Sequence, residues 1–177
     1  WAAQSREERW LAAELLGMIT EARDEEVTLR LNRWLDQVDH YDVADALAES
    51  AGGPWLRGDP VTHLQQIRTW LVVNGRYKQR YALMSMLWLA EDRSYGDVVA
   101  VINVLPTRLY QVDVEVRNVI PRVLRELTLK NATPVVNLLR DWANTLDRNA
   151  HWAVRHSLDN LDQDTRQALL VQLRGRG

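Results

Sequence analysis

The spacing of apolar residues constrains the fold most, because it repeats with the period of an α-helix along nearly the whole chain. In residues 24–38, Val27, Leu31, Trp34 and Val38 fall on one face of a helix. Such a stripe is typical of a helix that buries one side. About ten short segments follow this rule, and none alternates in the manner of a β-strand. The sequence therefore predicts an all-α protein.

Polar residues, prolines and glycines mark the ends of these segments. Ser5 and Glu8 form a capping-box pattern, and Asp59-Pro60 predicts another helix start. A short helix is predicted from Tyr41 to about Ser50, ended by Gly52-Gly53-Pro54. Asp113 is predicted to cap a helix over residues 114–130. Pro121 falls inside this helix, and we expect it to bend the helix.

Helices this short must bury their apolar stripes against their neighbours in the chain. The economical architecture is an α-solenoid of antiparallel helix pairs, here predicted as a single domain over residues 1–177. No strict repeat motif is visible, so the repeats are degenerate.

The composition excludes several classes of function. The 177 residues include no cysteine, which rules out disulfides, thiolate metal sites and cysteine nucleophiles. The four histidines lack the spacing of metal ligands, and no phosphate-binding glycine loop or hydrolase motif is present. We therefore expect no metal and no cofactor. No apolar run is long enough to cross a membrane and no signal peptide is visible, so a cytoplasmic protein is expected.

Charge is distributed unevenly along the chain. Residues 1–56 carry five Arg against twelve acids, whereas residues 57–177 carry fifteen Arg and two Lys against twelve acids. Arginine suits bidentate contacts with phosphate. A genome rich in G and C would also favour arginine codons, and the net charge of −2 alone does not indicate nucleic acid.

The segment LDQVDHYDVADAL, residues 35–47, holds four carboxylates at intervals of three residues. They do not form one stripe, because residues four apart share a helix face. Tyr41 and Asp45 therefore lie together, whereas Asp42 points elsewhere. Without further information, the residues alone favour a solvated acidic surface here, with Asp39 as a candidate N-cap.

Two arginine clusters follow. Arg76 and Arg80 lie one turn apart beside Tyr77, and Arg122 and Arg125 lie off the apolar stripe of their helix. Each cluster is consistent with a salt-bridged exterior. On neighbouring helices of a solenoid, they are equally consistent with a phosphate-binding wall.

The order HYDVADAL, NGRYKQRYALMSML and VRNVIPRVLREL resembles the AlkD family of HEAT-like-repeat alkylpurine DNA glycosylases. The resemblance runs from about Arg6 to Leu161, and each motif is short. The family's aromatic-Asp-x-x-Asp helix matches residues 41–45, which places its catalytic carboxylate on Asp45. Its Gln-Arg-x-Ala motif matches residues 79–82, which places a phosphate-binding arginine on Arg80.

The resemblance implies further roles. It implies a concave DNA-binding face, with Tyr41 and Arg122 at the positions that contact the lesion and its sugar. Further phosphate contacts are expected from a basic set consisting of Arg76, Lys78, Arg125 and Arg155. The family prototype has tryptophan at the positions of Tyr41 and Arg122, and family members have N-terminal helices that we expect to be missing from this chain, which begins without Met.

The activity that the resemblance implies is hydrolysis of the N-glycosidic bond of N3- or N7-alkylated purines, without flipping the base and without a lyase step. Arg122 in place of tryptophan suggests bulky adducts, as in relatives that give antibiotic producers self-resistance. The expected partner is double-stranded DNA, bound by a monomer at the bacterial nucleoid. The alternatives are a catalytically silent DNA-binding paralogue and a protein-binding helical scaffold.

Overall fold

The structure, a computed structural model, describes residues 5–19, 24–73, 75–105 and 112–175. In this part of the chain all regular structure is helical, and no strand occurs. The helices are α1 (Arg6–Gly17), α2 (Asp24–Leu35), α3 (Tyr41–Leu47), the π-helical turn η1 (Ala48–Gly52), α4 (Gly53–Gly58), α5 (Pro60–Val72), α6 (Arg76–Glu91), α7 (Val98–Ile102), α8 (Val114–Arg117), α9 (Ile120–Lys130), α10 (Ala132–Ala143), α11 (Arg148–His156) and α12 (Gln163–Arg174).

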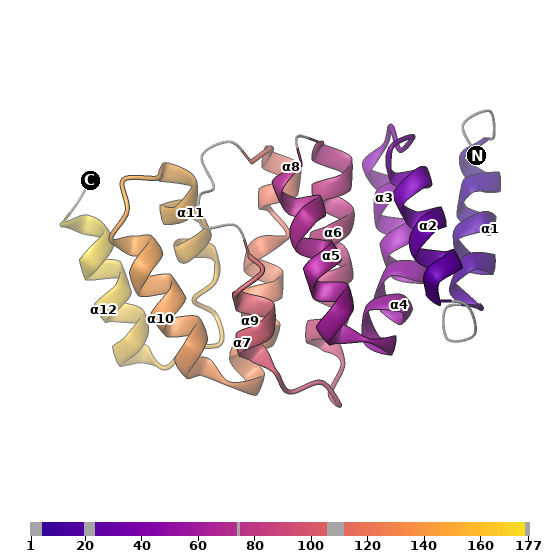
Figure 1. The fold of residues 1–177 in the computed structure, drawn as a ribbon. Helices are drawn as coiled ribbons and strands as arrows, with labels where there is room; N and C mark the ends of the chain where they lie inside the picture. Colours follow the sequence, from indigo (N-terminus) through magenta and orange to yellow (C-terminus); the bar gives the residue numbers. More distant parts are fainter. Residues whose placement is uncertain (1–4, 20–23, 74, 106–111, 176–177) are drawn as a thin grey trace.

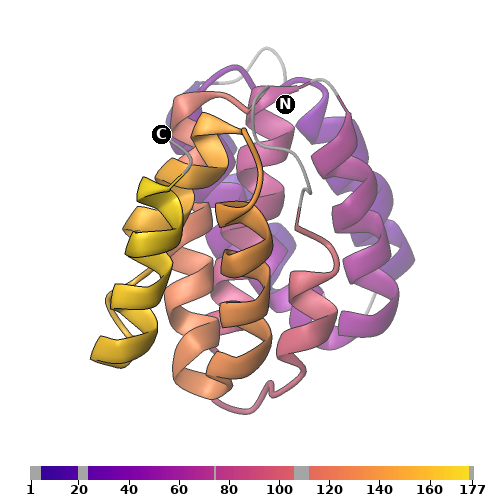
Figure 2. The same ribbon diagram turned by 90° about the vertical axis from the view of Figure 1, so that its left-hand side faces the viewer.

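These helices stack in two layers along one direction, so that the chain forms an α-solenoid (Figure 1). One layer runs through α3, α6, α9 and α11, each in contact with the next. The other runs through α5, α7, α10 and α12. Figure 2 shows the two layers from the C-terminal end of the stack. The predicted all-α solenoid is confirmed.

The apolar stripes meet between the layers in one continuous core. Val27 and Leu31 of α2, whose spacing was noted in the sequence, are fully buried. Helix α6 is the most enclosed, with nine buried residues along its length. Burial of apolar surface on this scale is the main stabilising contribution to such a fold. Within the described residues, no helix has the length and apolar character needed to cross a bilayer.

The structure corrects two predicted helices. The segment 114–130 is not one helix bent at Pro121. It breaks between α8 and α9, and Pro121 lies in the first turn of α9. Proline suits that turn because its missing N–H has no helical acceptor there.

The helix that begins at Tyr41 also differs from its prediction. It does not stop at Gly52-Gly53 but passes through the π-turn η1 into α4. The cap is different too, because His40 occupies the N-cap position and Asp39 instead pairs with Arg9, with 2.7 Å between Oδ1 and Nη1.

Candidate active site and nucleic-acid interface

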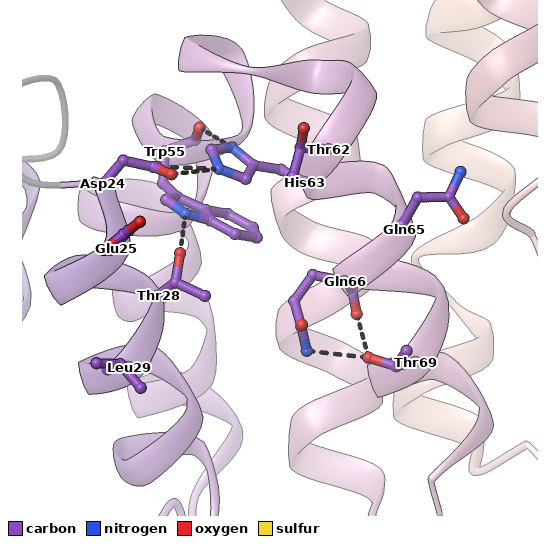
Figure 3. Close-up of a pocket in the computed structure, with 10 residues that line it drawn as sticks. All are labelled: Asp24, Glu25, Thr28, Leu29, Trp55, Thr62, His63, Gln65, Gln66 and Thr69. Carbon is purple, nitrogen blue, oxygen red and sulfur yellow. Dashed lines mark hydrogen bonds and ion pairs between the residues drawn. The ribbon is translucent and has the colours of Figure 1, made fainter.

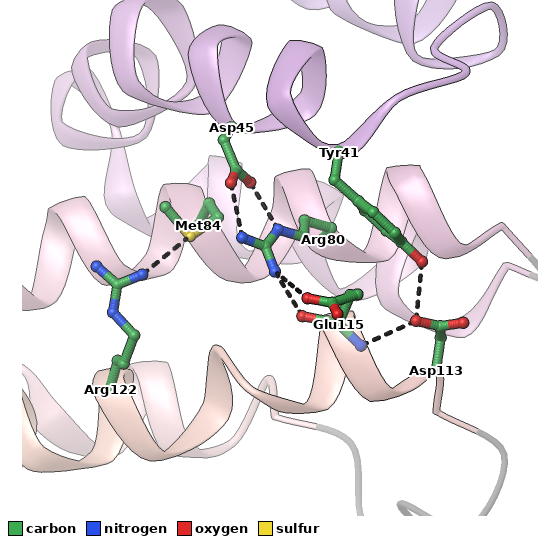
Figure 4. A network of polar contacts seen from close by, with 7 residues as sticks. All are labelled: Tyr41, Asp45, Arg80, Met84, Asp113, Glu115 and Arg122. Carbon is green, nitrogen blue, oxygen red and sulfur yellow. Dashed lines mark hydrogen bonds and ion pairs between the residues drawn. The ribbon is translucent and has the colours of Figure 1, made fainter.

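The centre of the site is a carboxylate–guanidinium pair between α3 and α6 (Figure 4). Arg80 Nε donates to Asp45 Oδ1 at 2.7 Å, and Arg80 Nη2 donates to Asp45 Oδ2 at 2.6 Å. The two side chains thus form a bidentate pair, the strongest geometry for these groups. The Asp45 side chain keeps 31% of its surface exposed, compared with 13% for Arg80.

Helix α8 supplies the third contact of Arg80. Its Nη1 donates to the backbone oxygen of Glu115 at 2.5 Å, and the Glu115 carboxylate lies 4.0 Å away. Hydrogen bonding to Asp45 is the largest cause that raises the pKa of Arg80. Arg80 is therefore a fixed positive charge held by three helices, with Asp45 on its exposed side.

Tyr41, one turn before Asp45 on α3, is held by a residue that the sequence did not single out for the site. Its hydroxyl donates to Asp113 Oδ1 at 2.8 Å. Burial first, and then this hydrogen bond, raise the pKa of Tyr41 to about 12. The same hydrogen bond is the largest cause that lowers the pKa of Asp113. Tyr41 is therefore a neutral hydrogen-bond donor at physiological pH.

Cations and a second ring surround Tyr41. The Tyr77 ring meets it edge-on with 4.9 Å between centroids. The guanidinium carbons of Arg76 and Arg80 lie 5.8 and 5.6 Å from the Tyr41 centroid. These distances are within the range of cation–π attraction. The predicted group of Tyr41, Asp45, Arg76 and Arg80 thus comes together in space.

Arg122 approaches this group from α9, the next helix of the same layer. It is exposed, and its Nη1 lies 3.9 Å from the sulfur of Met84 on α6. Burial and the charge of Glu126 raise the pKa of the Glu91 carboxyl group, and the positive charge of Arg122 opposes this rise. Arg122 therefore adds a solvent-facing positive charge beside the Asp45–Arg80 pair.

The remaining predicted phosphate ligands lie in different settings. Lys78 Nζ lies 2.5 Å from Asp36 Oδ1, and the Lys78 side chain is only 14% exposed. Arg125 Nη1 pairs with Asp159 at 2.9 Å and points toward the carbonyl of His156 on α11. Arg155 is exposed and has no ionic or hydrogen-bonding partner in the described part of the chain.

Helix α11 carries a basic and aromatic stripe that the sequence reading largely missed. Arg148, Trp152 and Arg155 are spaced to share one face of the helix. Arg117 of α8 stacks on Trp152 with its guanidinium carbon 4.1 Å from the ring centroid, and His156 lies 4.0 Å from Trp152 on a near-parallel ring. The pattern WxxRH indicates an aromatic residue and two basic residues on neighbouring positions of this helix. Arg117, which stacks on Trp152, is too distant in sequence to be recognised from that pattern.

Side-chain contacts connect neighbouring helices around this site. Arg80 contacts Asp45 of α3 and Glu115 of α8, Arg122 contacts Met84 of α6, and Arg125 contacts the carbonyl of His156 on α11. We use the term basic surface for the seven arginines of α6, α8, α9 and α11 described above, which are Arg76, Arg80, Arg117, Arg122, Arg125, Arg148 and Arg155. Arginine on the exposed edges of successive solenoid helices attracts an extended polyanion.

A pocket of about 590 Å³ lies away from this surface, between α2 and α5 of the other layer (Figure 3). His63 links its walls: Nδ1 lies 2.6 Å from the Trp55 carbonyl oxygen and Nε2 lies 2.9 Å from Asp24 Oδ1. Both ring nitrogens therefore lie within hydrogen-bonding distance of an oxygen. We regard this arrangement as structural. No group of three metal-ligating side chains is found in the described ranges.

The fold and this surface define a helical-repeat protein with a carboxylate set among arginines on one layer. Residues 1–161 match the model of the family described as DNA alkylation repair enzyme. The chain belongs to this family, and its role is in the repair of alkylated DNA. No curated protein and no solved structure matches the chain.

The raised pKa of Tyr41 leads to a testable pH dependence. The unfolded chain deprotonates this phenol near 10, whereas the folded chain does so near 12. Tyr41 therefore contributes stability that is full below pH 10 and is lost as the pH rises toward 12. We expect the free energy of unfolding of Tyr41→Phe to fall less steeply over this interval than that of the unmodified protein. Denaturant titrations at several pH values measure this slope, and equal slopes would contradict the assignment.

Proposed function

We propose that the protein is a monofunctional DNA glycosylase that hydrolyses the N-glycosidic bond of purines alkylated at N3 or N7. The observation that carries the proposal is the half-exposed Asp45 carboxylate, paired with Arg80 and bordered by exposed arginines in a family of alkylation repair. Carboxylate and phosphate-binding groups are thus adjacent, as hydrolysis at a DNA sugar requires.

The chemistry needs little beyond one carboxylate. Alkylation makes the purine a cationic leaving group, so no strong general acid is required. Asp45 stabilises the oxocarbenium-like sugar and accepts a proton from the attacking water. When a lesion sugar lies at the site, a backbone phosphate competes with Asp45 for the Arg80 guanidinium, so that a carboxylate oxygen of Asp45 becomes free for the sugar.

The lysines support a reaction that stops at the abasic site. A lyase step needs a free amine to form a Schiff base. The chain has two lysines. Lys78 is paired with Asp36, and Lys130 donates to the backbone oxygens of Asp92 and Tyr95.

The surroundings of the pair also bear on the substrate. In this proposal the lesion stays stacked in the duplex, and Tyr41 and Arg122 flank its sugar. Arg122 is exposed, with a methionine sulfur as its polar contact, so it is available to a phosphate. Because the base is not flipped into a pocket in this proposal, a bulky adduct meets no pocket wall. Self-resistance against a DNA-alkylating metabolite is the biological role that fits such a preference.

The test is base release from duplex DNA with a defined N7-alkylguanine or N3-alkyladenine, in small and bulky versions. We expect free alkylpurine by chromatography and strand cleavage only after alkali, which reports an abasic site. Equal rates for methyl and bulky adducts would remove the bulky-adduct preference. No release from any substrate would overturn the glycosylase.

The basic surface makes a separate prediction about DNA affinity. Replacing Arg148 and Arg155 together with glutamine removes two exposed cations of α11. If both contact phosphate, the slope of log affinity against log salt should fall by about 2, because each contact contributes roughly 0.9. Fluorescence anisotropy with an undamaged duplex measures it. The matched control is Arg68→Gln with Arg140→Gln, two exposed arginines of the other layer. An equal change in the control would contradict a specific surface.

One observation favours a second candidate, a silent DNA-binding protein. Both Asp45 oxygens are engaged by Arg80, so a pair that never opens would serve only to position the arginine. That protein would bind duplex DNA with normal salt dependence and release no base. The two assays above separate the candidates.

A further inference from the structure

Asp113 makes two contacts through the same oxygen. Its Oδ1 accepts the Tyr41 hydroxyl at 2.8 Å and the backbone N–H of Glu115 at 2.9 Å (Figure 4). The second contact is an ordinary N-cap, because Asp113 precedes the first residue of α8. The first contact reaches 72 positions back along the chain to α3. A cap requires only the second contact, so the first calls for a separate explanation.

The first turn of α8 touches the site at two points. Asp113 holds Tyr41, and Glu115 accepts from Arg80 through its backbone oxygen at 2.5 Å. Tyr41 and Arg80 are the two neighbours of Asp45 in the cluster, one on its own helix and one across from it. The first turn of α8 therefore contacts both residues that lie next to the Asp45 carboxylate.

The hydroxyl contact adds a directional restraint to a ring that is otherwise held by packing. Tyr41 is the first residue of α3 and is half-buried, with the Tyr77 ring edge-on and two guanidinium groups over its ring. A hydrogen bond to a charged acceptor is stronger than one between neutral groups. Asp113 is the acceptor of this bond, and the bond is the largest cause that lowers the pKa of the Asp113 carboxyl group.

We propose that Asp113 is a positioning residue, which holds the Tyr41 ring beside the Asp45–Arg80 pair through the Tyr41 hydroxyl. The inference rests on the proposed glycosylase function, because the ring that it positions is the one that flanks the lesion sugar. Asp113 itself does not touch the substrate. Its effect passes through one hydrogen bond, which makes it separable from its role as a cap.

Three substitutions isolate the hydrogen bond. Tyr41→Phe keeps the ring and removes the donor. Asp113→Ser keeps a good N-cap, but its oxygen lies one bond closer to the backbone and does not reach Tyr41. Asp113→Asn keeps both the cap and a neutral acceptor at full length, and so serves as the conservative variant. Asp162→Ser is the matched control, because Asp162 caps α12 through Thr165 at 2.8 Å, away from the site.

The measurement is the single-turnover rate of base release, together with the affinity for the lesion duplex and the melting temperature. We expect Tyr41→Phe and Asp113→Ser each to slow release by about ten- to a hundred-fold, the effect of one hydrogen bond to a charged group. Asp113→Asn should recover part of the rate. Affinity for the lesion duplex should change no more than in Asp162→Ser. The melting temperature should fall in Tyr41→Phe and in Asp113→Ser, because the same hydrogen bond also stabilises the fold, so release is measured well below the melting temperature of each variant.

The double variant gives the sharpest test. If both single substitutions remove the same bond, Tyr41→Phe with Asp113→Ser should be no slower than either alone. Additive losses, or single variants as fast as the unmodified protein, would overturn the positioning role while leaving the glycosylase in place. An unmodified protein that releases no base overturns the proposed function, and the positioning role with it.

Discussion

Replacing Asp45 with asparagine should slow release of an alkylated purine by about 10²- to 10⁴-fold, the range that a positioned general base contributes. Asparagine keeps the size of the side chain and one acceptor for Arg80, but it loses the negative charge that stabilises the cationic sugar. Duplex affinity should be unchanged or higher, because Arg80 no longer faces a carboxylate. Single-turnover release and anisotropy measure the two quantities.

The control is Asp42→Asn on the same helix. Asp42 is exposed and pairs with Arg6 at 3.1 Å on a surface where such pairs contribute little. This variant should release base at the unmodified rate. Comparable losses in both variants would point to damage to α3, and an active Asp45→Asn protein would place the chemistry elsewhere.

The second large effect concerns Gly52, the last residue of the π-turn η1. A Cβ at Gly52 would overlap Ser85 Oγ and lie 2.8 Å from the hydroxyl oxygen of Tyr81. Ser85 and Tyr81 are both fully buried on α6, and Ser85 Oγ donates to the backbone oxygen of Tyr81 at 2.9 Å, so neither side chain has room to move. Only a glycine allows η1 to approach α6 this closely.

We expect Gly52→Ala to cost about 1–3 kcal/mol, as overpacking of a core does. At about 2–4 °C per kcal/mol for a chain of this size, the melting temperature should fall by several degrees. Because α3 leads directly into η1, the substitution should also displace Asp45 from Arg80 and slow base release. Differential scanning calorimetry and the release assay measure both.

Gly58 offers the matched control for this prediction. A Cβ there meets no atom within 4 Å, so Gly58→Ala gains helix propensity without a clash. Its melting temperature should be equal or slightly higher. A Gly52→Ala protein as stable as Gly58→Ala would mean that α6 adjusts and that the close approach is not required.

The fold was predictable because each helix carries its own apolar stripe, and a solenoid needs contacts only between neighbours. The positions at which helices break or change type were harder to predict. The split between α8 and α9 depends on Pro121 occupying a first turn, which the helical pattern on both sides obscured. The π-turn η1 places Gly52 against Ser85 and Tyr81 of α6, and a contact of this kind leaves no local pattern in the sequence.

The site was only partly predictable, for a related reason. The residues alone favoured a solvated surface for Asp45, and its place beside Arg80 came from the resemblance. The structure brings these two together. Ion pairs across helices, such as that of Lys78 with Asp36, depend on side-chain placement that a single sequence does not contain. The role of Lys78 in phosphate binding therefore remains a prediction, and Asp113 was read only as a cap.

The closed Asp45–Arg80 pair also has a kinetic consequence. A repair protein spends most of its time on intact DNA, passing from one phosphate to the next. A bare carboxylate on the contacting surface would repel each phosphate in turn and slow that movement, whereas a neutral pair does not. Under the proposed function, pairing therefore lets the chain move along undamaged duplex without repulsion between Asp45 and the phosphates.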